Sequence, residues 1–158
     1  MTTFENKKFD EERALYGVDG VVLKNCAFDG PVDGESALKE SRNVQVYNTF
    51  CNLRYPFWHD DNLIIDSCDM TQLCRAALWY SNDIEIRSTK LHGIKALREC
   101  SNVKLQNCDI ISPEFGWSVR NITMENCTAQ SEYFMMRSED LKFINVDFKG
   151  KYSFQYIN

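Results

Sequence analysis

Side chains capable of acid–base chemistry gather in two short segments of the sequence. His59, Asp60 and Asp61 are consecutive, and His92 and Lys95 follow further along. Two carboxyl groups that flank a scissile bond are the machinery of glycoside hydrolysis. Asp60, Asp61 and His92 are therefore the catalytic candidates, although adjacent side chains of an extended segment point to opposite faces. The alternative interpretation is that Asp61 forms a turn and the histidines are ordinary surface residues.

A second set of candidates consists of large rings that recur at one position of the repeat described below. Trp58, Trp79 and Trp117 share this position with Arg98, and Tyr80 and Glu114 adjoin it as further ligand-binding candidates. A charged guanidinium is costly in a narrow core, which favours an outward position. An exposed aromatic stripe would hold sugar rings or another protein. Alternatively, the rings pack against one another and are structural.

The sequence predicts no metal site and no cofactor. Asp66 and Asp69 align with Arg87 and Lys90 of the next repeat, which indicates charge pairing between neighbouring strands instead of a cation site. No CxxC motif occurs. Four cysteines nevertheless share one position, where we expect buried thiols that fill a corner: Cys26, Cys68, Cys108 and Cys127.

These candidates are carried by a repeat with a period near 20 residues. Each copy begins at a Gly, Asn or Asp anchor, at Gly20, Asn43, Asn62, Asp83, Asn102, Asn121 and Asp140. The first and third residues after each anchor are apolar, whereas the second and fourth are mostly polar. This alternation predicts a strand with one buried face. The fifth residue is Asn or Ser and is expected to form a turn, and its repetition at one position would let the amides and hydroxyls stack as a ladder.

A short fixed period without helical periodicity is typical of a solenoid. We predict an all-β fold, a single-stranded right-handed parallel β-helix of about seven to eight turns of roughly 20 residues. A leucine-rich repeat is the rival, but its strand motif and following helix are missing. One domain is expected over 1–158, with an N-terminal cap and first half-turn at 1–18, repeats at 19–151 and an incomplete last turn at 152–158. The segment 29–35, rich in Gly, Pro and Asp, is expected to be a surface loop.

The turn sequences resemble those of a known family. Tyr55-Pro-Phe-Trp58, Ala77-Leu-Trp-Tyr80 and Glu114-Phe-Gly-Trp117 are similar to segments of the bacterial domain-of-unknown-function family 3737, and so is the opening 9–17. The resemblance covers nearly the whole chain and implies a shortened member with a pectate-lyase-like β-helix and no established activity. The acidic segment and His92 also resemble, in part, the aspartates and histidine of polygalacturonases, but the Asn-Thr-Asp and Arg-Ile-Lys motifs of those enzymes are absent.

Composition restricts the partners. The 158 residues carry 18 basic and 23 acidic side chains, a net charge of -5, without a basic run that would bind nucleic acid. No apolar run is long enough for a membrane helix. The 7 cysteines and the lack of an export signal favour a reducing, cytoplasmic location.

These patterns lead to two alternative functions. The first is a binding or structural module whose stripe contacts a glycan or a protein. The second is a carbohydrate-active enzyme of the lyase or hydrolase type. A β-helix also ends in an exposed apolar cross-section unless something covers it, so we expect a homo-oligomer through the C-terminal rung, most simply a two-fold dimer. Its contact would use Phe143, Ile144, Phe148, Phe154 and Tyr156.

Overall fold

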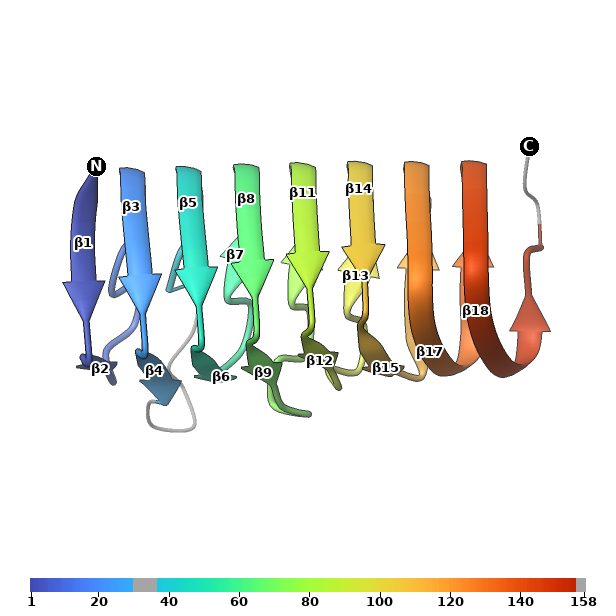
Figure 1. Cartoon of the computed structure of the whole chain (residues 1–158), viewed down its shortest axis with the longest axis horizontal. Helices are drawn as coiled ribbons and strands as arrows, with labels where there is room; N and C mark the ends of the chain where they lie inside the picture. The colour runs from blue at the N-terminus through green and yellow to red at the C-terminus, as the bar shows by residue number, and fades with distance from the viewer. Residues whose placement is uncertain (30–36, 156–158) are drawn as a thin grey trace.

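The computed structural model of the chain describes residues 1–29 and 37–155, which form eighteen β-strands and no helix (Figure 1). The loop expected at 29–35 lies almost entirely outside these residues. Apolar and polar side chains alternate along the strands, because each strand buries one face and exposes the other. The fold class predicted from the sequence is confirmed.

The strands stack on three faces of one coil. The first face contains the long strands, which are β1 (Thr2–Glu5), β3 (Asp19–Lys24), β5 (Arg42–Tyr47), β8 (Asp61–Asp66), β11 (Asn82–Arg87) and β14 (Ser101–Gln106). The second face contains β2 (Lys8–Phe9), β4 (Ala27–Asp29), β6 (Phe50–Asn52), β9 (Asp69–Met70), β12 (Lys90–Leu91) and β15 (Asp109–Ile111). The third face contains β7 (Phe57–Trp58), β10 (Leu78–Trp79), β13 (Leu97–Arg98) and β16 (Glu114–Trp117). The last two strands, β17 (Arg120–Met136) and β18 (Glu139–Ser153), bend through all three faces.

Every strand pairs in parallel with the equivalent strand of the next turn. In β11, for example, Ile84 is opposite Val103 of β14 on one side and Leu63 of β8 on the other. In Figure 1 the chain runs down the front strands and returns behind them while it advances from the N-terminal to the C-terminal end, which makes the coil right-handed. Equivalent residues of successive turns therefore form columns along the rod, about 4.8 Å apart.

The recurrent Gly, Asn and Asp anchors have a backbone reason. All seven anchors have positive φ, and strand pairing passes over them: Asn82 pairs with Ser101 and Ile84 with Val103, while Asp83 between them pairs with nothing in the ladder. Gly, Asn and Asp adopt this left-handed conformation most readily. Each anchor is thus a left-handed break in the pairing at the start of a long strand, and because it recurs at the same position in every turn the register of the strands is unchanged.

Two further columns with positive φ form corners of the coil. One lies five residues after the anchor, at Asn25, Asn48, Ser67, Ser88, Asn107, Asn126 and Asn145. The other lies three residues before it, at Gly17, Glu40, His59, Tyr80, Glu99, Ser118 and Arg137. The sequence indicates the first corner through its amides, but the second is occupied by such varied residues that no pattern predicts it.

An amide ladder does form, but mainly at the anchors and not at the fifth position. Asn62 Nδ2 donates to Asn43 Oδ1 at 2.7 Å, and Asn121 Nδ2 donates to Asn102 Oδ1 at 2.9 Å. At the fifth position the corresponding bond joins Asn145 to Asn126 at 2.7 Å. The left-handed conformation that the anchors share aligns their side chains along the rod, so each amide can form a hydrogen bond with the next.

The core is the column of inward side chains from all three faces. The predicted first and third positions are buried from Val21 and Leu23 through Ile122 and Met124. All seven cysteines are buried and free, in agreement with the corner-filling interpretation. Burial of apolar side chains supplies most of the stability of such a coil.

The N-terminal segment differs from the expected cap. Thr2–Glu5 pairs with β3 and Lys8–Phe9 pairs with β4, so residues 1–18 form a first turn of the coil. At the other end, Leu141 and Phe143 are only partly buried, because no later turn covers them in the described part of the chain. The expected last turn at 152–158 is described only as far as 155.

Within residues 1–29 and 37–155 there is no helix that could span a membrane. In the same residues, no group of three or more His, Cys, Asp or Glu side chains is arranged to hold a metal ion.

Candidate functional site

The aromatic stripe lies on the third face and consists of Trp58, Trp79, Arg98 and Trp117, one residue from each of β7, β10, β13 and β16. Trp58 stacks on Trp79 with ring centroids 5.0 Å apart and 27° between the planes. The Arg98 guanidinium lies 4.9 Å from the Trp79 ring and 6.0 Å from the Trp117 ring. Ring, ring, guanidinium and ring therefore form one continuous stack along the rod.

This stacking determines which parts of the rings meet solvent. Trp79 is covered by Trp58 on one face and by Arg98 on the other. Its indole Nε1 donates a hydrogen bond of 2.9 Å to the backbone oxygen of Lys95. All four side chains of the stripe are partly buried. The stripe thus faces outward, as predicted, but it presents ring edges to solvent while the ring faces cover one another.

A second pair of rings flanks the stripe at the neighbouring corner. His59 and Tyr80 stack with centroids 5.0 Å apart and only 11° between their planes. Tyr80 also lies 5.5 Å from Trp58, and Tyr55 meets Trp58 edge-on at 5.3 Å. Tyr80 is 37% exposed, and His59 is exposed as well. Tyr80 was predicted at the site, whereas Tyr55 and His59 were not predicted as part of the stripe; the signal for His59 is its position in register with Tyr80.

Glu114, also predicted at the stripe, is engaged by an ion pair. Its Oε2 lies 3.5 Å from Lys95 Nζ, and both side chains are about one-third exposed. The cavity between these residues, Arg98 and Trp117 measures about 10 Å³. A space of this size holds at most one water. Glu114 therefore closes the surface beside the stack and does not line a ligand pocket there.

The catalytic candidates do not converge. Asp60 is completely buried at the inner side of a corner, whereas Asp61, the next residue, is exposed and accepts a bond from Asn82. His92 follows β12 on the second face and donates its backbone N–H to Met70 at 3.0 Å. It is thus separated from the two aspartates by about half a turn of the coil. The structure brings together neither the pair of carboxylates nor the histidine with either of them.

Asp60 has an unusual environment for an acid. Its Oδ1 accepts a 2.7 Å hydrogen bond from the backbone N–H of Ser41, and its Oδ2 has no partner among the described residues. The pKa of Asp60 is raised from 3.8 to about 8, mainly by burial; the hydrogen bond from Ser41 opposes this rise, and the nearby charges of Asp61 and Glu40 contribute to it. The carboxyl is thus protonated at neutral pH and has no access to a substrate.

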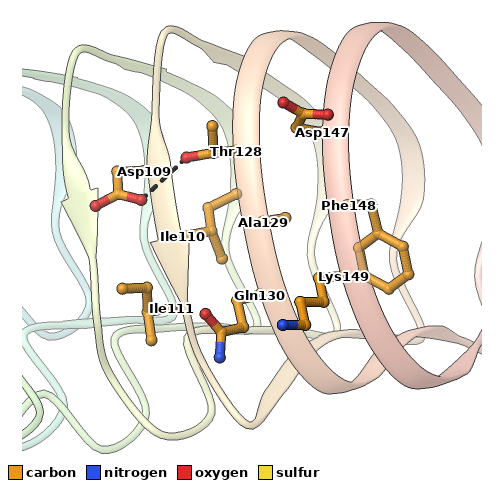
Figure 2. Close-up of a pocket in the computed structure, with 9 residues that line it drawn as sticks. All are labelled: Asp109, Ile110, Ile111, Thr128, Ala129, Gln130, Asp147, Phe148 and Lys149. Atoms are coloured by element: carbon orange, nitrogen blue, oxygen red, sulfur yellow. Dashed lines mark hydrogen bonds between the residues drawn. The ribbon is translucent and has the colours of Figure 1, made fainter.

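Sequence reasoning missed a polar groove on the second face (Figure 2). Asp109, Thr128 and Asp147 occupy one column of β15, β17 and β18. Thr128 Oγ1 donates to Asp109 Oδ1 at 3.0 Å, and His92 Nε2 lies 3.1 Å from Asp109 Oδ2. An open depression of about 280 Å³ lies over this column and is also lined by Ala129 and Lys149. The signal was the seventh residue after the last five anchors, which is Asp69, Lys90, Asp109, Thr128 and Asp147.

The groove has one feature of a glycosidase site. Asp109 and Asp147 are two rungs apart in this column, which places the two residues about 10 Å from each other. That spacing lies at the outer limit of the carboxyl separation used by inverting glycosidases. The His92–Asp109 contact supplies a titratable group beside one carboxylate. The arrangement is nevertheless shallow and solvated, with Asp109 49% exposed.

Comparison with known proteins identifies relatives by family but not by activity. Residues 2–158 match the family described as "Protein of unknown function (DUF3737)". No curated protein matches the sequence. Among solved structures, one similar chain is described as a putative glycosyl hydrolase from Parabacteroides merdae, with a TM-score of 0.38 and 7% sequence identity. The alignment covers 92% of the present chain and 77% of the other.

Proposed function

The chain belongs to the DUF3737 family of proteins of unknown function, and we propose that it is a binding module whose aromatic stripe contacts another protein. The observation that carries the proposal is the continuous outward stack of Trp58, Trp79, Arg98 and Trp117, flanked by the exposed Tyr80. Trp, Tyr and Arg are the residues most enriched at the energetic centres of protein interfaces.

The orientation of the rings favours a protein over a glycan. A sugar binds aromatic side chains by lying on an open ring face. Both faces of Trp79 are occupied, by Trp58 and by Arg98. Ring edges and the stem of an arginine suit the side chains of an extended peptide rich in proline or apolar residues. The stack is also rigid, so little side-chain entropy is lost when a partner binds.

The partner-binding proposal includes a cytoplasmic location. All seven cysteines are free thiols, and several neighbours such as Cys108 and Cys127 occupy adjacent turns without a disulfide. Free thiols are typical of a reducing compartment.

A carbohydrate-active enzyme is the second candidate, and Asp109 with Asp147 is the observation that favours it. If the groove cleaves or modifies a polysaccharide, Asp109→Asn should abolish product formation from polygalacturonate and other plant and bacterial glycans. Asp61→Asn, outside the groove, is the matched control. Absence of activity in the unmodified protein across this glycan set would eliminate the candidate.

The stripe can be tested directly with peptides and glycans as probes. A phage library of random 15-residue peptides and a glycan array are screened with the folded protein, and selected peptides are titrated by fluorescence anisotropy. Peptides with proline or apolar residues should bind in the micromolar range. Tyr80→Ala should weaken the tightest peptide by at least about fivefold, the effect of losing more than 1 kcal/mol at an interface.

Phe50→Ala provides the matched control, because Phe50 is a 36% exposed ring on the second face. It should leave peptide affinity unchanged, and thermal melts should show that both variants remain folded. If glycans bind and peptides do not, the partner is a carbohydrate. If no probe binds, or if Tyr80→Ala and Phe50→Ala have equal effects, the stripe is a structural stack and the proposal fails.

A further inference from the structure

Among the described residues, the first and the last strand of the coil each have one edge without a paired strand. Within the described residues β1 pairs only with β3, and β18 pairs only with β17 (Figure 1). Partly buried aromatic side chains lie at both ends: Phe4 and Phe9 in the first turn, and Phe143, Phe148 and Phe154 in the last. Exposed strand edges and apolar side chains together are a template for another chain.

The repeat register shows which residues would meet if the first turn of one copy were placed on the last turn of another. Phe4 is in the column of Leu23, and Lys8 and Phe9 are in the columns of Ala27 and Phe28. Continued through each turn, these columns reach Phe143, Asp147 and Phe148 of β18. Residues 2–10 of one copy would thus lie along residues 141–149 of the other, as a normal next rung.

The charges in this register are complementary. Lys8 would meet Asp147, and Asp10 would meet Lys149 of the second copy. All four side chains are exposed, and none has an ion-pair partner in the part of the chain that the structure describes. No like-charged residues face each other between 2–10 and 141–149. Figure 2 shows Asp147 and Lys149 on the last turn of the coil.

The same alternation of acidic and basic residues occurs between turns inside the coil. Lys90 lies in the same column as Lys8 and Asp147, between Asp69 and Asp109 of the adjoining turns. A Lys8–Asp147 contact would repeat this alternation of acid and base across the molecular boundary. Opposite charges that face each other on neighbouring strands are stabilising.

Aromatic and amide columns would continue as well. Phe9 stacks on Phe28 inside the molecule with centroids 5.0 Å apart and 15° between the planes, and Phe148 would offer Phe9 a second ring on its other side. In the neighbouring corner column, Asn145 donates to Asn126 at 2.7 Å. Asn6, which has the same left-handed conformation, would extend that amide ladder.

We propose that copies of this chain stack head to tail, with β1 and β2 of one copy added to the exposed edge of β18 of the next. A two-fold dimer through the C-terminal rungs would make β18 antiparallel to its copy and would break every one of these columns. Head-to-tail stacking keeps the parallel ladder and the observed charge order. Such a heterologous contact does not close, so it produces an open series of assemblies.

Sedimentation velocity of the 158-residue chain from about 1 to 200 μM tests the proposal, a range that covers micromolar association. The expected result is a graded series of species that grows with concentration and shrinks as salt screens the charges. Lys8→Asp and Asp147→Lys should each weaken association by about tenfold or more, because each places like charges at the contact. The double variant, which restores opposite charges in every contact, should recover assembly.

Lys104→Asp is the matched control, since it makes the same charge change on an exposed residue in the middle of the first face. It should leave association unchanged, and melts should show that every variant remains folded. Three outcomes would overturn the proposal. They are a monomer at every concentration, a closed dimer that Lys8→Asp does not affect, and a double variant no better than the single ones.

Discussion

Replacing the buried Asp60 by serine should stabilise the protein, and the gain should grow with pH. Serine already occupies this column at Ser41, Ser81 and Ser138. Ser81 Oγ accepts the backbone N–H of Asp60 at 3.1 Å, and Ser138 Oγ accepts that of Val119 at 3.0 Å. A serine at position 60 can therefore accept the Ser41 N–H that Asp60 accepts now, without burying a carboxyl group.

The size of the gain follows from the pKa of Asp60, which is 3.8 in the unfolded chain and is raised to about 8 in the folded protein. Between these values the folded protein holds a proton that the unfolded chain has released, so raising the pH favours unfolding. At pH 7 the interval is about three pH units, each worth about 1.4 kcal/mol, or about 4 kcal/mol in total. The smaller serine leaves a void that costs about 1 kcal/mol.

The expected net gain for Asp60→Ser is thus about 3 kcal/mol at pH 7 and close to zero at pH 4.5. Urea unfolding followed by circular dichroism at pH 4.5, 6, 7 and 8 measures it. Above pH 8 the gain should level off, since the carboxyl is then ionised in both states. Asp61→Ser, which changes the exposed neighbour, should leave the pH dependence nearly unchanged.

Two results would refute this reasoning. One is a difference in unfolding free energy between Asp60→Ser and the original protein that stays constant from pH 4.5 to 8. The other is a loss of stability at every pH, which would mean that the carboxyl is bound by a partner that outweighs its burial.

The remaining predictions concern the core, the stripe and the thiols. Ile86→Asp should prevent folding because Ile86 is 0% exposed, while Glu85→Ala on the opposite side of β11 should change the melting temperature little; equal losses in melts would show the two faces to be misassigned. Trp79→Ala should cost about 2–4 kcal/mol in chemical unfolding, since it opens the stack on both sides; a silent substitution would mean that the stack adds no stability. Asn102→Ala should lower the free energy of unfolding by about 1–2 kcal/mol, because it removes two hydrogen bonds of the amide ladder and places alanine at φ 56°. Asn102→Gly should lower it less, and the reverse order in melts would contradict the backbone argument. None of the cysteines should react with a thiol reagent before unfolding, since all seven are buried; rapid labelling of the folded protein would disprove it.

The parts of the fold that repeat in the sequence could be predicted from it. The anchors recur because Gly, Asn and Asp adopt the left-handed conformation most readily, and the positions after them alternate because a strand has two faces. These are local constraints, and each leaves a residue type in every turn. The outward position of Arg98 was also predictable, because burying a guanidinium in a narrow coil is costly.

What the sequence could not decide depends on neighbours from other turns. In the sequence, Asp60 cannot be distinguished from an acid that forms a turn. Its contacts with Ser41 and Ser81 of the two adjoining turns show that it is buried and protonated. The tryptophans were recognisable as a column, but whether their faces or edges meet solvent was set by the guanidinium of Arg98 between them. The groove of Asp109, Thr128 and Asp147 exists only because three turns align these residues in one column. The pattern that repeats in every turn can be read from the sequence, whereas the burial of Asp60 and the orientation of the tryptophan rings depend on contacts between turns and require the coil itself.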